Sequence, residues 1–314
     1  MGAAHGHIAH LYEVDFTFRE IQTILGDIAK NKIPAFEKID GQNLMISYVD
    51  NNIVAARNKT QLKNPVGIEY IPELQFSKYP HVMETFENAI LNIQKAFEAI
   101  APTSLNKYFR NGKRFLSIEI YNKKSANVIH YNESMIVLNN FFDVDQNGNI
   151  TNPDPYAAMD FHMTYDIHFK NNDIYPPESL LGFQYDPNEF IEVCKSHGIT
   201  DINIPLSQYP LDIVKGCITH LTTLLLSTCK SKANKELTNS YIKQGIVDVL
   251  NQAKQNPILQ GKIMPHMKIL NKIPGYQKIV TGEGVVIYYK GMTFKLTGAF
   301  APINQILGIL KYSR

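Results

Sequence analysis

A lysine, an aspartate and a glycine stand together in the segment Phe36-Glu37-Lys38-Ile39-Asp40-Gly41-Gln42-Asn43-Leu44. Apolar and polar residues alternate after the glycine, which predicts a strand with the lysine at its entrance. Only about one free lysine in 2,500 is neutral at pH 7, because the ammonium has a pKa near 10.4. Burial, a neighbouring cation or a metal that arrives with a substrate would favour the amine and make Lys38 a nucleophile. A solvated lysine before an Asp-Gly turn is the alternative.

Five later segments combine a strand pattern with a polar or aromatic residue that could take part in chemistry. They are residues 53–56 followed by Arg57, 115–122 with Glu119, 135–144 with Phe141 and Phe142, 282–287 with Glu283, and 293–298 with Lys295. Glu119 stands between two isoleucines, and a buried carboxylate must be paired or bind a ligand. The guanidinium of Arg57 suits contacts with phosphate.

In this order, the segments resemble the covalent nucleotidyltransferases, the superfamily of ATP-dependent RNA and DNA ligases and mRNA capping enzymes. Those enzymes share a Lys-x-Asp-Gly motif, an arginine strand, a strand glutamate, an aromatic strand, a Glu-Gly-x-Val strand and a late lysine. Asn43 stands where DNA ligases and capping enzymes usually have arginine, as in RNA-repair ligases, which favours RNA. The chain also looks like uncharacterised ligase-like proteins of tailed phages, in residues 10–13 and 295–312.

The resemblance implies a reaction and a set of site residues. Lys38 would attack the α-phosphorus of ATP to give lysyl-AMP, with Glu283 and Lys295 as the other catalytic residues, and AMP would pass to a 5′-phosphate end that a 3′-hydroxyl then joins. Residues that would bind the nucleotide are Glu37, Asp40, Gly41, Asn43, Arg57, Glu119, Phe141 and Phe142. One of the two phenylalanines would stack on adenine, although a core position for either is an equal alternative. Glu283 and Glu119 would hold Mg²⁺.

The last two predicted strands carry a geometric test. A three-residue loop at 289–291 would place Glu283 and Lys295 on the same face of the hairpin, whereas a two-residue loop would put them on opposite faces. We expect the first register, because the chemistry needs both residues on one side. The similar enzymes usually have two lysines with one residue between them here, and this chain has Thr297 or Thr293 at one of those positions.

Composition indicates an ordinary soluble globular protein. The 314 residues are 44% hydrophobic and 19% charged, with a net charge of +2, so a nucleic-acid partner would need a local basic patch. The three cysteines suggest neither a zinc site nor a disulfide framework. We expect no membrane span and a reducing cytoplasm, that of the host if the chain is phage-encoded. We expect His5, His7 and His10 to belong to a flexible lead-in rather than a metal site.

The expected fold class is α+β, a nucleotidyltransferase domain of antiparallel sheets with flanking helices. Its first part would be residues 1–147, a mostly helical insert would span 148–278, and a closing hairpin and short helix would occupy 279–314. We expect no OB domain after Gly298. Apolar spacing and capping patterns predict helices near 17–30, 82–100, 187–196, 211–228 and 234–254, and a loop at 59–77.

The insert contains the most basic region of the chain, which would be the polynucleotide-binding surface unless these are ordinary solvated helix faces. Its lysines are Lys230, Lys232, Lys235, Lys243, Lys254, Lys262, Lys268, Lys272 and Lys278. The sequence therefore favours an ATP-dependent RNA ligase that uses ATP and Mg²⁺. A DNA ligase, a GTP-using capping-type transferase, and a non-ligating nucleotide-binding or virion structural protein remain open.

Overall fold

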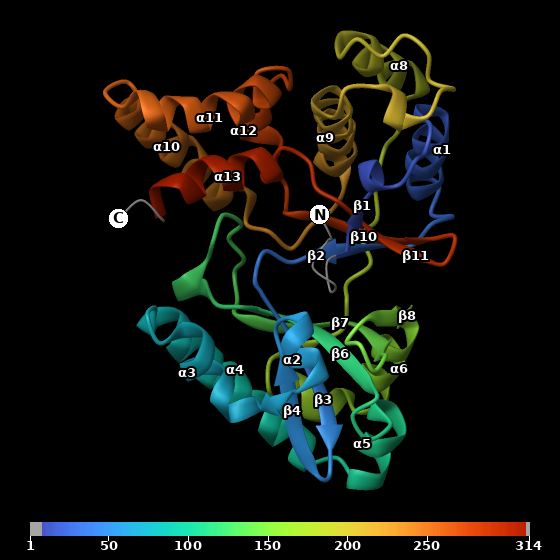
Figure 1. Cartoon of the computed structure of the whole chain (residues 1–314), viewed down its shortest axis with the longest axis vertical. Helices are drawn as coiled ribbons and strands as arrows, with labels where there is room; N and C mark the ends of the chain where they lie inside the picture. The colour runs from blue at the N-terminus through green and yellow to red at the C-terminus, as the bar shows by residue number, and fades with distance from the viewer. Residues whose placement is uncertain (1–7, 312–314) are drawn as a thin grey trace. The chain divides into compact units, whose positions relative to one another are not determined.

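The structure of the chain is a computed structural model that describes residues 8–311. The chain divides into two compact units, of which unit 1 comprises residues 39–127 and 133–178 and unit 2 the remaining described residues. Both units combine helices with a sheet, so the α+β class is confirmed (Figure 1). Lys38 ends one segment of unit 2, and Ile39 begins unit 1.

Unit 1 is built on a seven-stranded mixed sheet in the order β5-β4-β3-β6-β7-β8, with β9 parallel to β7. Its strands are β3 (Gln42–Val49), β4 (Asn52–Ala56), β5 (Val66–Gly67), β6 (Arg114–Tyr121), β7 (Met135–Val144), β8 (Ile150–Asp154) and β9 (Ile174–Tyr175). Alternation of apolar and polar residues along β3 and β6 gives the sheet one strongly apolar face, whose residues join a single buried cluster.

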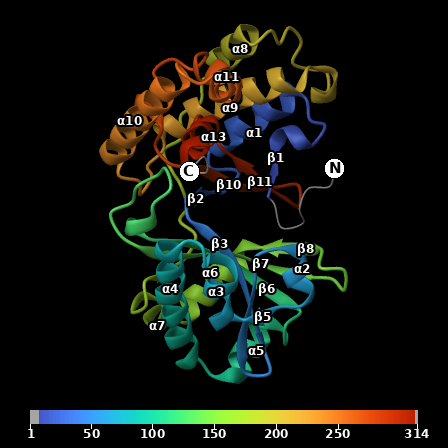
Figure 2. The ribbon, with the colours of Figure 1, turned by 60° about the vertical axis from the view of Figure 1, so that its left-hand side comes forward.

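Five helices bury that apolar face. They are α3 (Ile71–Phe76), α4 (Pro80–Glu98), α5 (Pro102–Phe109), α6 (Pro155–Thr164) and α7 (Asp166–Lys170). The short helix α2 (Lys59–Lys63) instead packs Leu62 in a smaller cluster on the other face. The predicted stripe of α4 is confirmed, because Phe86, Ile93 and Phe97 pack in one cluster with Leu44 and Ile118 of the sheet. Figure 2 shows α4 beside the strands of unit 1. The loop expected at 59–77 is wrong, since α2, β5 and α3 lie there.

Unit 2 contains a four-stranded sheet in the order β1-β11-β10-β2. Its strands are β1 (Ala9–His10), β2 (Ala35–Lys38), β10 (Gly284–Tyr289) and β11 (Met292–Leu296), and β1 runs parallel to β11 while the other pairs are antiparallel. The sheet thus joins the beginning of the described chain to a hairpin close to its end. Local sequence patterns cannot predict pairing between segments so far apart in the chain.

Helices of unit 2 cover one face of this sheet and extend beyond it. They are α1 (Phe18–Ala29), α8 (Pro187–Ser196), α9 (Leu211–Thr228), α10 (Lys235–Ala253), α11 (Pro257–Leu270), α12 (Tyr276–Ile279) and α13 (Phe300–Lys311). A single core joins α1, α8 and α9 to the sheet residues Val285 and Phe294. The predicted capping box of α1 is confirmed, because Thr17 caps the helix and Glu20 bonds back to the Thr17 backbone.

The observed division differs from the expected parts 1–147, 148–278 and 279–314. Residues 150–175 contribute β8, α6, α7 and β9 to unit 1, because β8 and β9 pair with β7. The helices from α8 onward share unit 2 with the closing hairpin, because α8 and α9 pack in the core under it. None of the helices within residues 8–311 is long and apolar enough to cross a bilayer.

Candidate active site

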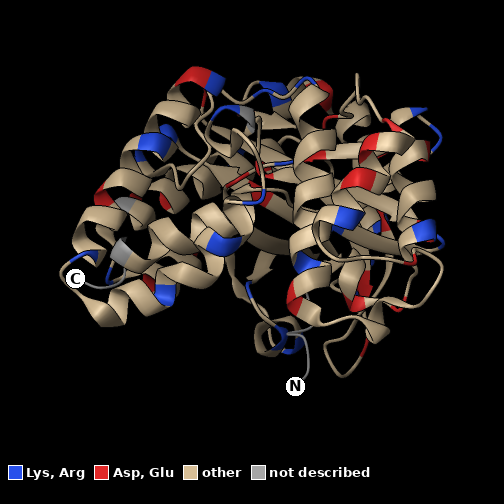
Figure 3. Cartoon of the chain, turned by 90° about the horizontal axis from the view of Figure 1, so that it is seen from above, with Lys and Arg blue, Asp and Glu red and all other residues tan. Residues whose placement is uncertain are grey.

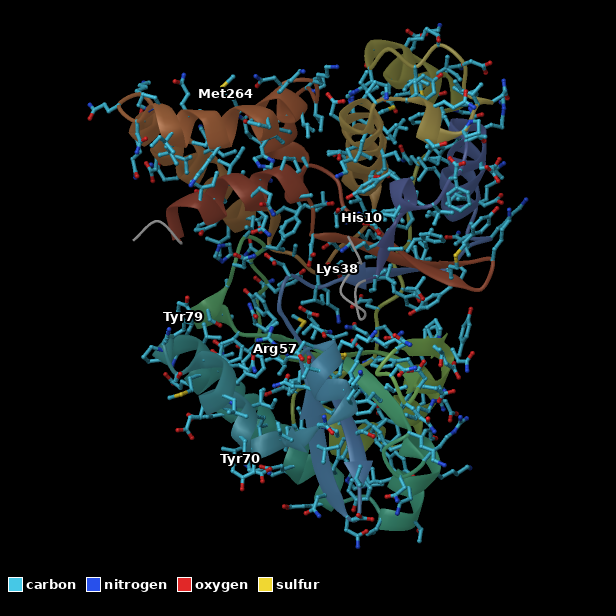
Figure 4. The ribbon with its side chains drawn as sticks, viewed as in Figure 1. His10, Lys38, Arg57, Tyr70, Tyr79 and Met264 are labelled. Atoms are coloured by element: carbon cyan, nitrogen blue, oxygen red, sulfur yellow. The ribbon has the colours of Figure 1, made fainter. Side chains whose placement is uncertain are left out.

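The strands of unit 2 place the two predicted catalytic lysines on one face of their sheet. Lys38 on β2 lies opposite Gly284 on β10, and Lys295 on β11 lies opposite Val286 on β10. Residues that lie opposite each other in paired strands point to the same face, as do alternate residues of one strand. Lys38 and Lys295 therefore share a face, although they lie far apart in the sequence. Figure 4 labels Lys38 on this sheet.

Lys38 forms an ion pair with Glu283, and the two side chains are only 22% and 11% exposed. Glu283 directly precedes β10, so the alternation of that strand does not fix its direction. The carboxylate favours the ammonium form of the lysine and is also a proton acceptor in direct contact with it. The predicted nucleophile is therefore shielded from bulk water and held by a carboxylate that sequence reasoning had assigned to the same site.

The hairpin between β10 and β11 has the other register. Tyr289 pairs with Met292, which leaves a two-residue loop, Lys290-Gly291, with φ of 50° and 74°. Both residues are left-handed, as a type I′ turn requires, so the expected three-residue loop is wrong. A two-residue loop was expected to put Glu283 and Lys295 on opposite faces of the hairpin. This separation does not occur, because Glu283 lies outside the strand and pairs with Lys38 on the face that carries Lys295.

Lys295 is half-buried, and burial lowers its pKa to about 8. The side chain is therefore still mostly protonated at pH 7. A cation in a partly dry environment interacts more strongly with an anion than one in water. Lys295 thus has the electrostatic character required to neutralise a phosphate.

Glu37 points to the opposite face from Lys38, because the two are neighbours in β2. It is buried and accepts hydrogen bonds from Ser231 Oγ at 2.5 Å and from the Lys232 backbone N–H at 3.2 Å. Burial raises the pKa of this carboxyl, and the two hydrogen bonds oppose the rise. These contacts fix β2 to the segment that follows α9.

A second group of predicted residues lies together in unit 1. Asn43 on β3 lies opposite Glu119 on β6, and its Nδ2 donates to Ser117 Oγ at 2.9 Å and to the Ile118 carbonyl at 3.2 Å. The Glu119 charge acts on Arg57 and opposes the lowering of the arginine pKa by burial. Asn43 and Glu119 are therefore direct neighbours on adjacent strands, and the Glu119 charge reaches Arg57.

Aromatic rings fix the guanidinium of Arg57. Its Cζ lies 4.8 Å from the ring centre of Phe76 and 5.4 Å from that of Phe86, and Nη2 donates to Gln42 Oε1 at 3.3 Å. A stacked guanidinium loses little further freedom when it binds a ligand. Phe76 was not expected at the site, and no local pattern distinguishes it from other core aromatics.

Asp40 and Gly41 have clear local roles in unit 1. Asp40 is buried and accepts a hydrogen bond from Asn127 Nδ2 at 3.1 Å. A Cβ at Gly41 would lie 2.6 Å from the Ile120 carbonyl oxygen, so only glycine allows this approach of β3 to β6. Both residues shape the strand entrance, whether or not they also contact a nucleotide.

Phe141 and Phe142 are core residues, and the expected stacking of one of them on adenine is not supported. Phe141 is 0% exposed and packs in an aromatic cluster with Phe109 and Phe161. Phe142 is 2% exposed and stacks on Phe115 on the other face of the sheet. Because their side chains alternate on β7, each is covered by a different set of neighbours.

His10 departs from the expected flexible lead-in, because it belongs to β1 and lies opposite Lys295 in register. Its ring stacks on that of Tyr12, with centroids 4.7 Å apart and an interplanar angle of 11°. The other two histidines of the predicted lead-in, His5 and His7, lie outside the described residues. Sequence patterns alone gave no reason to connect His10 with the late lysine.

The hairpin between β7 and β8 has the acid spacing of a cation-binding loop, which sequence reasoning overlooked. The pattern is Asp143, Asp145, Asn147, Gly148 and Asp154. In the structure Arg110 contacts Asp143 at 3.2 Å and Arg114 contacts Asp154 at 2.8 Å, so arginines of the chain itself balance these carboxylates. The contacts indicate a structural loop.

Across residues 8–311 there is no cluster of three or more His, Cys, Asp or Glu side chains that could hold a metal ion. Mg²⁺ commonly binds through one or two carboxylates together with substrate phosphates, so a preformed protein cage is not required for a metal that arrives with ATP.

Comparison of the sequence with protein-family models and with curated proteins gave no match.

Proposed function

We propose that the chain is an ATP-dependent polynucleotide ligase of the nucleotidyltransferase fold, with RNA as the preferred substrate. The observation that carries the proposal is the ion pair of Lys38 with Glu283 on the sheet face shared with Lys295. These three residues come from separate motifs of the sequence, and the strands of unit 2 bring them to one face of the sheet. A solvated lysine before a turn would have no such surroundings.

In the proposed first step, Lys38 Nζ attacks the α-phosphorus of ATP. An N–P bond forms, the bond from the α-phosphorus to the bridging oxygen breaks, and pyrophosphate leaves with its electron pair. Glu283 accepts the proton that the ammonium must lose before attack. Lys295 neutralises negative charge that develops on the α-phosphate, where a preorganised cation contributes most. Mg²⁺, when bound with ATP, would screen the phosphates.

We assign nucleotide contacts to the polar group of unit 1 by the same resemblance. The guanidinium of Arg57 suits phosphate or ribose oxygens, and Glu119 and Asn43 suit ribose hydroxyls. The pairing of Asn43 with Glu119 and the restraint on Arg57 by two rings support this assignment. The later steps transfer AMP to a 5′-phosphate and let a 3′-hydroxyl displace it.

The polynucleotide is proposed to bind the lysine-rich part of unit 2. Residues 230–278 carry nine lysines against two acidic residues, a formal charge of +7, whereas the rest of the chain has 22 basic and 27 acidic residues. All nine lysines are exposed, on α10, α11 and the segments around them. Figure 3 marks the Lys and Arg positions of the ribbon in blue. A local excess of this kind supports contacts with a phosphate backbone even at a net charge of +2.

Incubation with α-labelled ATP or GTP and magnesium tests the first step. We expect a covalent label from ATP that Lys38→Ala abolishes, while Lys195→Ala, at an exposed lysine on α8, retains it. Labelling from GTP alone would instead favour a capping-type transferase. Nicked RNA and nicked DNA then distinguish the two kinds of ligase, and we expect faster sealing of RNA.

A non-ligating nucleotide-binding or virion structural protein is the second candidate. Thr297 stands where the similar enzymes usually have a second lysine, which favours a protein that has lost the later steps. Absence of covalent label with either nucleotide, together with retained nucleotide binding, would support this candidate and contradict the ligase.

A further inference from the structure

Unit 2 holds a second set of nitrogen groups that the proposed first step does not use. His10 lies opposite Lys295 in the parallel pairing of β1 with β11, so its side chain is on the face that carries both lysines. Across this face the order of strands is β2, β10, β11 and β1. Nitrogen groups therefore follow one direction across the sheet, from Lys38 through Lys295 to His10.

Tyr12 connects these nitrogen groups to Lys215 on helix α9. The His10 ring stacks on the Tyr12 ring, and the Nζ of Lys215 on α9 lies 5.1 Å from the centre of the same ring. A cation over an aromatic face is held in place by the ring quadrupole. Tyr12 thus contacts both the imidazole and the ammonium. A hydrogen bond of 3.1 Å from the backbone N–H of His10 to the Glu13 carboxylate fixes the turn that carries Tyr12.

These groups act on one another electrostatically. Burial is the main cause that lowers the pKa of His10; Glu13 opposes it, and the charges of Lys215 and Lys38 add to it. Burial also lowers the pKa of Lys295 to about 8. Partly withdrawing several such groups from water costs free energy that a bound anion would offset.

We propose that His10 and Lys215, which extend the cationic face beyond Lys295, form a polyphosphate-binding row for the β- and γ-phosphates of ATP, an assignment that rests on the proposed function for its choice of nucleotide. In phosphoryl transfer the leaving group departs roughly in line with the attacking atom and on the far side of phosphorus. A chain of phosphates that begins at Lys38 would therefore extend away from it, and the row lies in that direction across the sheet. Its ligand class is a linear polyphosphate.

Calorimetric titration of the full chain with inorganic tripolyphosphate and magnesium at pH 7 tests the row without nucleotide chemistry. We expect the wild type to bind, and Lys215→Met and His10→Asn each to weaken binding about tenfold. Lys195→Met, an exposed lysine on α8 that belongs to neither the row nor the lysine-rich surface, is the matched control and should bind as the wild type does. No binding by the wild type, or equal weakening by the control, would overturn the row.

Two further measurements keep the outcome clear. In the wild type, an NMR titration should show the pKa of His10 rising when tripolyphosphate is bound, which needs no variant to fold. An RNA oligonucleotide without terminal phosphates tests whether the row binds a polynucleotide backbone instead. If Lys215 is required for binding of this RNA, and tripolyphosphate does not bind, the proposal is overturned. If tripolyphosphate binds and no protein is labelled by ATP, the row stands and the ligase fails.

Discussion

The two faces of the four-stranded sheet in unit 2 differ in the side chains that dominate them, although the same strands build both. One face presents Val285, Ile287, Phe294 and Leu296, all essentially inaccessible to solvent and packed against α1, α8 and α9. The other presents Lys38, Lys295 and His10, all only partly withdrawn from water. The apolar face stabilises the sheet, and this stability allows the other face to hold cations in a costly environment.

The largest effect should follow from Glu283→Gln on the polar face. The variant removes the proton acceptor of Lys38, so the initial rate of lysyl-AMP formation should fall about 100-fold or more. Rates with α-labelled ATP measure this, and Glu236→Gln, an exposed acid on α10, is the control. An unchanged rate in Glu283→Gln would break the assignment of chemistry to this face.

The apolar face should instead control stability. Phe294→Ala removes a side chain that is fully buried and should lower the free energy of unfolding by about 3–5 kcal/mol. Val286→Ala, on the polar face and only partly buried, should cost clearly less. Urea unfolding followed by circular dichroism compares the two variants, and equal losses would contradict the division of roles.

The pH dependence of stability sharpens the comparison through Lys295. Its pKa in the folded chain, about 8, lies below the ordinary 10.5, so the unfolded chain binds more protons between these values. The contribution of Lys295 to the free energy of unfolding therefore rises with pH across this window. Lys295→Met should stabilise the chain most below pH 8, and the gain should vanish near pH 10.5. A gain that is independent of pH would argue against a buried charge.

A smaller effect is expected from two histidines on the helices that cover the apolar face. His197 Nε2 lies 3.3 Å from His220 Nδ1, and burial lowers the pKa of both, that of His197 from 6.5 to about 4. Below pH 6.5 the unfolded chain binds more protons than the folded chain, so the free energy of unfolding should decrease as the pH is lowered from 6.5 to about 4. Urea unfolding at several pH values should show a smaller loss of stability at low pH in a His197→Gln, His220→Gln variant. An identical loss in the variant and the wild type would mean that other groups cause it.

Local features of the fold were predictable because they depend on neighbours in sequence. The capping box at Thr17 and the apolar spacing of residues 187–196 and 211–228 gave helices that the structure confirms. The helix α11 (Pro257–Leu270) was not predicted, since it contains Pro265 and a weak apolar stripe. Tertiary contacts with α13 compensate for both.

Features of the site that depend on distant pairing were predicted less well. The motif residues Lys38, Glu283 and Lys295 were identified, but the hairpin register was not, because a lysine at φ 50° is an unfavourable choice for a two-residue loop. Pairing of β1 with β11, which brings His10 to Lys295, has no local signal at all. The burial of Phe141 depends on helices that follow it in the sequence.

The most direct test is to locate the covalent adduct. Full-length chain incubated with ATP and magnesium should yield, on proteolysis and mass spectrometry, AMP attached through a phosphoramidate to the peptide that contains Lys38. The Lys38→Arg variant should yield none. AMP on a different lysine, or no adduct in a folded wild-type chain that binds ATP, would contradict the assignment of Lys38 as the nucleophile.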